Sequence, residues 1–261
     1  MITLYQFQFS HFCEKARWAL DHKGLAYGRK NLLPGRHINV ARKMAPKSCV
    51  PILVDDGTVV QDSTKIITYL DATFPQRPLT PHDARHAAEA VQWEEYLDEE
   101  IGVPLRLWFY FHTLPDRGRA LRFLLDGAPW YGWPLLGLMF SQLRTTMMQR
   151  MNINAESARQ AEERLLRGLE RLDRTLKDRS FLVGNSFTRA DLTACALLAP
   201  LCAPDKFEAE VSAAFPPPVC ALRNAVRTRP FFGWVVQTYR EHRWPAAQAP
   251  APAFVGVPAR V

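Results

Sequence analysis

The chain has 261 residues, of which 48% are hydrophobic and 23% are charged, a composition typical of a folded globular protein and not of a disordered or fibrous one. The formal net charge is +7, and residues 1–80 account for +5 of it, which suits either an anionic ligand or an ordinary solvated surface. No dense basic run is interleaved with aromatic residues, so we expect no nucleic-acid partner. Five cysteines without paired spacing argue against a disulfide framework, and no Cys/His cluster indicates a metal site. The first residues show no secretory signal pattern, so we expect a cytoplasmic location and reduced thiols.

The first unit of the chain is a strand, a tight turn and a helix. A run of β-favouring residues predicts a strand over residues 2–7. Ser10 can cap the helix that follows, and apolar residues recur at helical spacing until Gly24 ends it. Ser10 and Cys13 therefore place a hydroxyl and a thiol at a helix N-terminus, where unpaired N–H groups and the helix dipole favour an anion. The thiolate of Cys13 and the thiolate of a bound ligand would both qualify.

The next elements complete a small α/β unit. Residues 25–33 predict a second strand, and residues 36–45 predict a basic loop or short helix. A strand, a turn rich in Asp and Gly, and another strand over residues 52–60 predict a hairpin. A helix is expected over residues 64–73.

The start of that helix is a second candidate anion site. The Ser63 hydroxyl and the free N–H groups of the first turn can hold a carboxylate, whereas the acidic Asp62 can hold an ammonium group. His37 in the preceding basic segment can contact a ligand carboxylate, or it can be merely solvated.

A proline-rich segment, residues 74–81, separates this unit from a helical remainder. We place one domain at residues 1–76, a second at residues 82–244, and a Pro/Ala-rich tail at residues 245–261. Helical periodicity predicts helices in this part over residues 82–112 with a break near Gly102 and Pro104, 119–125, 155–178, 192–201, 219–228 and 231–242. Thr188 and Asp191 form a capping box for the fourth of these, which is a structural role.

Residues 127–143 contain no charged residue. Two prolines interrupt this stretch, which is also too short for a comfortable membrane span. Its aromatic residues, and those of the helix before residue 112, can form the walls of a roomy apolar site, or they can be core residues. The candidates are Trp108, Tyr110, Trp130, Trp133 and Met139. Contact of residues 127–143 with a membrane surface is a third interpretation.

Three stretches in this order resemble the glutathione S-transferase family, in particular its bacterial type with a Ser-x-x-Cys turn. They are residues 3–24, the Val-Pro hairpin and acidic-Ser helix start at residues 46–70, and the capping segment at residues 182–192. The resemblance implies a thioredoxin-like α/β N-terminal domain followed by an all-α C-terminal helical domain. It also implies glutathione as co-substrate and a homodimer as the assembly.

The resemblance assigns roles to residues of the N-terminal unit. It implies that Pro51 is cis and that the backbone of Val50 pairs with the cysteinyl part of glutathione. Asp62 and Ser63 would hold the γ-glutamyl end. Many members carry a lysine where this chain has Cys49, so the glycyl carboxylate would need a substitute cation. The candidates for contacts at that end are Lys47, Arg36 and His37.

The implied activity is transfer of the glutathione thiolate to an apolar electrophile. Ser10 would stabilise the thiolate by donating a hydrogen bond to the sulfur. Phe12 joins the aromatic residues above as a candidate substrate contact. Two alternatives stay open: thiol-transferase or reductase chemistry through a mixed disulfide of Cys13, and a non-catalytic binding or membrane-surface protein.

Overall fold

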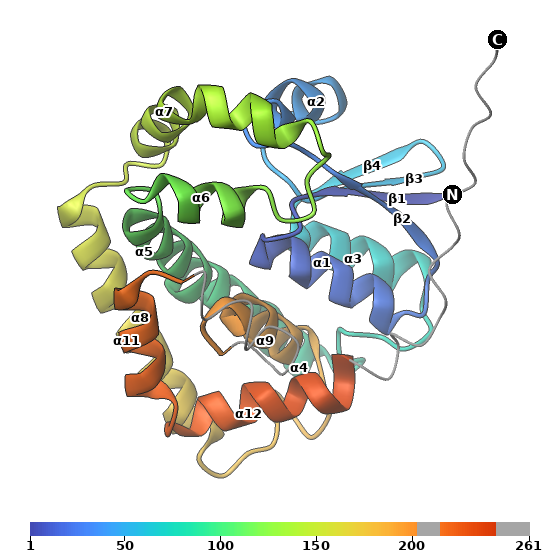
Figure 1. Ribbon diagram of the computed structural model, residues 1–261. Coiled ribbons are helices and arrows are strands. Elements are labelled where there is room, and N and C mark those ends of the chain that lie inside the picture. The colour runs from blue at the N-terminus through green and yellow to red at the C-terminus, as the bar shows by residue number, and fades with distance from the viewer. Residues whose placement is uncertain (203–214, 244–261) are drawn as a thin grey trace.

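The computed structural model describes residues 1–202 and 215–243 (Figure 1). The predicted tail at residues 245–261 lies outside the described residues.

The N-terminal part is a four-stranded mixed sheet with helices on both faces (Figure 1). Its elements are β1 (Ile2–Gln6), α1 (His11–His22), β2 (Tyr27–Asn31), α2 (His37–Met44), β3 (Ile52–Asp55), β4 (Thr58–Gln61) and α3 (Ser63–Thr73). The strand order is β2-β1-β3-β4, with β2 parallel to β1 and the other pairs antiparallel. The buried Leu4 and Leu53 pair on the central strands β1 and β3. The predicted strands and helices are confirmed here, and the basic segment forms the short helix α2.

The rest of the described chain is helical. Its elements are α4 (Ala84–Leu97), a π-helical turn (Asp98–Gly102), α5 (Val103–Thr113), α6 (Arg117–Leu124), α7 (Gly132–Arg150), α8 (Ala155–Leu176), α9 (Arg189–Cys202), α11 (Pro217–Val226), α12 (Pro230–Thr238) and a second π-helical turn (Tyr239–Arg243). The fold is a thioredoxin-like domain followed by a helical domain, as predicted. Residues 74–81 connect α3 to α4, and the division into domains at this segment stays a prediction.

The predicted break between α4 and α5 is the π-helical turn that ends at Gly102. A Cβ atom on Gly102 would lie 2.9 Å from Phe12 Cζ and 3.0 Å from Leu197 Cδ2. Only glycine therefore lets this turn approach α1 and α9 so closely. The break positions α5 across from the N-terminus of α1, which is where the candidate site lies.

A buried ionic network joins the two parts. The Lys15 ammonium on α1 lies 2.8 Å from Glu94 Oε1 on α4 and 2.8 Å from Asp98 Oδ2. It also donates a hydrogen bond to Thr64 Oγ1 on α3. Arg189 on α9 contacts the other oxygen of Glu94. Charges from α1, α4, the π-helical turn and α9 are thus matched, and α3 adds a hydroxyl. This network fixes the direction of α1.

The capping box at the start of α9 is confirmed. Asp191 Oδ2 accepts hydrogen bonds from the Thr188 N–H and the Thr188 hydroxyl, each at 2.8 Å. Asp191 Oδ1 accepts a third hydrogen bond, from the Leu182 N–H at 2.7 Å. The carboxylate is fully used by these contacts inside the core, which supports a structural role.

The uncharged stretch at residues 127–143 forms a loop and the first half of α7. A buried stripe of Gly132, Leu136 and Phe140 faces inward. Asn31 on β2 donates a hydrogen bond to the Gly127 carbonyl at 2.8 Å, which ties the loop to the sheet. Within residues 1–202 and 215–243, no helix has both the length and the apolar character needed to cross a membrane.

Candidate functional site

Ser10 occupies the N-cap of α1. Its backbone is extended, and its Oγ accepts a hydrogen bond from the Cys13 N–H at 3.4 Å. The Ser10 carbonyl accepts the first intrahelical bond, from the Glu14 N–H at 2.9 Å. The side chain is partly exposed and lines a pocket. Because the oxygen acts as an acceptor inside the chain, the hydroxyl proton is available to an anion in the pocket.

Cys13 is not accessible in this arrangement. The side chain is fully buried, and Sγ accepts a weak hydrogen bond from the Phe7 N–H at 3.5 Å. Burial raises the pKa of the Cys13 thiol, although the Arg17 guanidinium partly opposes this effect. A buried thiol with a raised pKa is a poor nucleophile.

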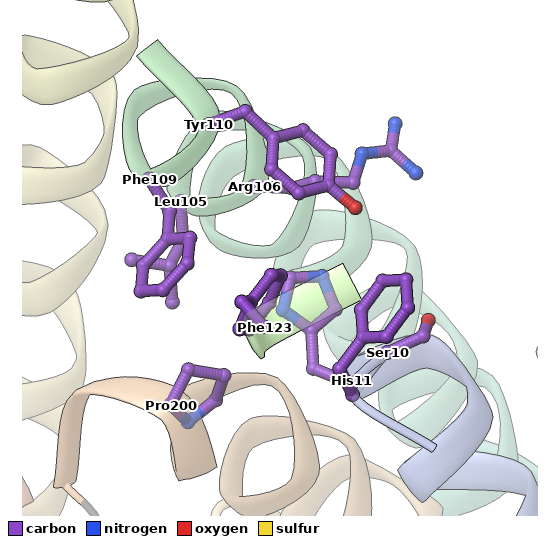
Figure 2. A pocket seen from close by; sticks show the side chains of 9 residues that line it. Ser10, His11, Leu105, Arg106, Phe109, Tyr110, Phe123 and Pro200 are labelled. Carbon is purple, nitrogen blue, oxygen red and sulfur yellow. The ribbon is translucent and has the colours of Figure 1, made fainter. Parts of the chain in front are cut away.

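The pocket lies between the N-terminus of α1 and the helical part, with an empty volume of about 340 Å³ including the space open to solvent (Figure 2). The lining residues are Phe9, Ser10, His11, Leu105, Arg106, Phe109, Tyr110, Phe123 and Pro200. Phe123 of α6 packs against Phe9 and Phe109, with ring centroids 4.8 Å apart in both pairs. The walls are therefore mainly aromatic and rigid, as expected of a site for an apolar molecule.

The predicted substrate contacts are only partly gathered at this pocket. Tyr110 lines it, whereas Phe12 is outside the lining, with its ring centroid 5.3 Å from the guanidinium carbon of the lining residue Arg106. Trp108 is 2% exposed and packs edge-on against a neighbouring ring in the helical core, outside the lining. Trp130 and Trp133 are 84% and 49% exposed and also lie outside the lining. Met139, on α7, is 45% exposed and also lies outside the lining. A part for these three in substrate binding stays a prediction.

The second predicted site is built at the junction of β3, β4 and α3. The Val50–Pro51 peptide bond is cis, as the family resemblance implies. The Pro51 carbonyl accepts a hydrogen bond from the Asp62 N–H at 3.2 Å, so the two predicted contact points lie side by side. Ser63, the first residue of α3, is 4% exposed, and its hydroxyl makes no hydrogen bond to a described residue.

Asp62 is the N-cap of α3 and has a φ of +96°. Its Oδ1 accepts hydrogen bonds from the Thr64 N–H at 3.0 Å and the Lys65 N–H at 3.4 Å. Its other carboxylate oxygen accepts none from the described part of the chain. A non-glycine residue with positive φ is costly and is concentrated at ligand-binding positions. The arrangement leaves one carboxylate oxygen for an ammonium group.

Gln61 holds the loop that carries the remaining predicted residues. Its side chain accepts from the Lys47 N–H at 3.0 Å and donates to the Lys47 and Cys49 carbonyls at 2.7 and 2.8 Å. The Lys47 and Cys49 side chains are exposed. His37 accepts a hydrogen bond from the Gly35 N–H at 3.1 Å, and burial lowers its pKa to about 4, so the imidazole is neutral at pH 7.

Of the nine lining residues, only Ser10 and Tyr110 were predicted from the sequence. The seven that were missed include His11, Arg106 and Phe123. His11 is adjacent to Ser10, and Arg106 is the only charged residue between Val103 and Phe111. That isolated charge on an apolar helix is the signal that could have identified it. The convergence of α1, α5 and α6 at one pocket was not visible in local patterns.

Two family models match the chain. The model described as "Glutathione S-transferase, N-terminal domain" matches residues 4–78, and the model described as "Glutathione S-transferase, C-terminal domain" matches residues 134–230. Together they match more than half of the chain, in the expected order. The chain belongs to the glutathione S-transferase family.

This glutathione S-transferase family member is similar to curated plant proteins. It is 32% identical over 145 residues to glutathione S-transferase 1 of Dianthus caryophyllus, a match that covers 48% of this chain and 66% of the relative. It is 25% identical over 247 residues to glutathione S-transferase TCHQD of Arabidopsis thaliana, covering 91% and 90%. For other curated relatives the chain spans less, 41% and 38% of the length of Arabidopsis glutathione S-transferases Z1 and Z2.

Solved glutathione S-transferases share the fold. A structure from Ceriporiopsis subvermispora in complex with glutathione superposes with a TM-score of 0.64 at 17% identity, covering 95% of this chain and 98% of that chain. At this level of identity the likeness shows the fold alone.

Proposed function

We propose that this glutathione S-transferase family member binds glutathione and transfers its thiolate to an electrophile held in the pocket beside Ser10. The observation that carries the proposal is the position of Ser10, which caps a 12-residue helix and lines the aromatic pocket with its hydroxyl proton available. Solved glutathione S-transferases of the same fold, one in complex with glutathione and one with glutathione sulfonate, support the choice of co-substrate.

Glutathione would be held at two points of the N-terminal part. The backbone of Val50, next to the cis Pro51, would pair with the cysteinyl backbone of the tripeptide. The unpaired Ser63 hydroxyl at the start of α3 would donate to the γ-glutamyl carboxylate, and the free oxygen of Asp62 would accept from the γ-glutamyl ammonium. Lys47 supplies an exposed cation for the glycyl carboxylate, and His37, being neutral, would contribute a hydrogen bond at most.

The chemical step follows from the Ser10 environment. The free thiol of glutathione has a pKa of about 8.5 and is mostly protonated at pH 7. A hydrogen bond from Ser10, together with the dipole of α1, lowers that pKa, and the thiol proton leaves to solvent. The thiolate then forms a bond to the electrophilic carbon, and the leaving group departs with the electron pair of the bond that breaks.

The alternative of a mixed disulfide at Cys13 receives less support. Its Sγ is fully buried, its pKa is raised, and it lies behind Ser10 rather than in the pocket lining. A homodimer and a cytoplasmic location belong to the proposal through the family resemblance alone.

Calorimetry of glutathione binding to the untagged protein at pH 7 tests the proposal. We expect a dissociation constant between micromolar and low millimolar for the wild type. Ser63→Ala should bind glutathione about tenfold more weakly, because a hydrogen bond to a charged group contributes about 1.5–3 kcal/mol. Ser141→Ala on the exposed face of α7 is the matched control and should leave the affinity unchanged. No measurable binding by the wild type would refute the proposed function and leave a non-catalytic role.

A further inference from the structure

Arg106 is a cation without a described partner in a pocket that contains no acid. Its guanidinium forms no hydrogen bond or ion pair with any residue that the structure describes, and its Nε atom is buried without a partner. The ring of Phe12 packs beside the guanidinium, with its centroid 5.3 Å from Arg106 Cζ. None of the lining residues is Asp or Glu. A partly buried guanidinium without a counter-charge is costly, so we expect it to bind an anion from outside the chain.

A second unpaired group lies in the same pocket. His11 is 7% exposed, and its Nε2 atom is buried without a hydrogen-bond partner. The hydroxyl of Tyr110 likewise has no hydrogen bond to a described residue. Buried polar groups of folded proteins are almost always satisfied, so the two buried atoms without a partner, His11 Nε2 and Arg106 Nε, indicate a polar ligand in this pocket. None of these three groups is among the glutathione contacts proposed above, although His11 directly follows Ser10 in the chain.

The polar and apolar groups are separated within the pocket. In Figure 2 the Ser10 hydroxyl, the Tyr110 hydroxyl and the Arg106 guanidinium lie toward one side, whereas Leu105, Phe109 and Pro200 lie toward the other. A ligand that fits both sides has an apolar body and an anionic group near its reacting end.

We propose that the electrophile of this enzyme carries a carboxylate or a similar planar anion, and that Arg106 binds this group. The proposal rests on the proposed transferase function and names the class of its second substrate. A guanidinium presents two parallel N–H donors, which match a carboxylate, and the Tyr110 hydroxyl can add a third. Arg106 is then a specificity-determining residue, which favours acidic electrophiles over neutral ones of the same shape.

The test compares two probes that differ only in charge, 4-chloro-3-nitrobenzoate and 4-chloro-3-nitrobenzamide. In both, the glutathione sulfur bonds to the ring carbon and chloride leaves with the electron pair of the C–Cl bond. Rates are divided by the uncatalysed rate of each probe with glutathione. Binding of each probe is also measured by calorimetry in the presence of S-methylglutathione, which has no thiol and cannot react.

The variants are Arg106→Gln and the control Arg122→Gln, which removes the same charge from an exposed position on α6 outside the pocket. We expect the wild type to prefer the benzoate, and Arg106→Gln to lose about tenfold to a hundredfold in kcat/KM and affinity for it. The kcat/KM and affinity of Arg106→Gln for the benzamide should differ from the wild-type values by less than about twofold. Arg106→Lys should retain part of the preference for the benzoate over the benzamide. The control should behave as the wild type.

Three results would overturn the proposal. If Arg106→Gln loses kcat/KM and affinity equally for both probes, Arg106 acts on glutathione or on the fold. A change in glutathione affinity or in the pKa of the glutathione thiol in this variant would show the same. A wild type that converts or binds the benzamide as well as the benzoate would remove the charge preference while the transferase function stands. A wild type that binds neither probe would show that the pocket takes no ligand of this class. If the wild type converts neither probe but binds the benzoate through Arg106, the anion site stands and the transferase function fails.

Discussion

Replacement of Glu94 by glutamine removes the central negative charge of the network that joins α1 to the helical part. Glu94 is fully buried and contacts Lys15 at 2.8 Å and Arg189 at 2.5 Å. With Asp98 included, two cations face two carboxylates in this network. The glutamine side chain has the same shape but no charge, so one buried cation is left without a counter-charge.

The size of the stability loss depends on which partners Lys15 and Arg189 keep in Glu94→Gln. Loss of one partner from a buried ion pair costs about 3–5 kcal/mol, because the remaining charge stays desolvated. Lys15 keeps Asp98 and the Thr64 hydroxyl, and Arg189 keeps the hydroxyls of Thr68 and Thr80. We therefore expect the free energy of unfolding to fall by about 3 kcal/mol, the lower end of that range.

Urea unfolding at pH 7, followed by tryptophan fluorescence and by circular dichroism, measures the effect. Glu95→Gln at an exposed position of α4 is the control and should change the stability by less than about 0.5 kcal/mol. The double variant Lys15→Met/Glu94→Gln should cost less than the sum of the single variants by about 1 kcal/mol or more. A loss below about 1 kcal/mol for Glu94→Gln would refute this account of the network.

Two further predictions concern the candidate site. Burial lowers the pKa of His11 to about 3, so the unfolded chain binds a proton from pH 6.5 downward while the folded chain does not. The free energy of unfolding should then fall by about 1.6 kcal/mol between pH 6.5 and pH 5. Urea unfolding should show a weaker pH dependence in His11→Asn but not in the exposed control His82→Asn. Equal pH dependence in the wild type and His11→Asn would contradict the neutral, buried imidazole. Gln61→Ala releases the loop at Lys47 and Cys49, so calorimetry should show glutathione affinity reduced by about fivefold to tenfold at unchanged thermal stability; an unchanged affinity would show that this loop does not order the ligand.

Local patterns predicted the elements whose signals are carried by neighbouring residues. The Ser10 cap of α1 and the Thr188–Asp191 capping box of α9 are contacts within three residues of each other, and both are present as predicted. The break near Gly102 was predicted from glycine and proline alone. Its cause, the close approach of Phe12 and Leu197, is a tertiary contact that no local pattern contains.

Local sequence patterns did not predict the pocket. Arg106, His11 and Phe123 meet only because α1, α5 and α6 converge, which depends on packing across the two parts of the chain. The aromatic residues of the uncharged stretch illustrate the converse. Trp130 and Trp133 are as apolar as core residues, yet α7 turns its stripe of Gly132, Leu136 and Phe140 inward. Trp133 on α7 and Trp130 in the loop before it are both exposed. Composition does not determine which face of an apolar helix is buried.

The central claim is that Ser10 stabilises the thiolate of bound glutathione. The most direct test is the ultraviolet titration of that thiolate in the wild type, in Ser10→Ala and in Cys13→Ala. We expect the wild type to hold the thiol pKa below the free value of about 8.5, Ser10→Ala to raise it by about 1–2 units, and Cys13→Ala to leave it unchanged. An unchanged thiol pKa in Ser10→Ala would contradict the assignment, and loss of the thiolate in Cys13→Ala would transfer the role to the buried cysteine.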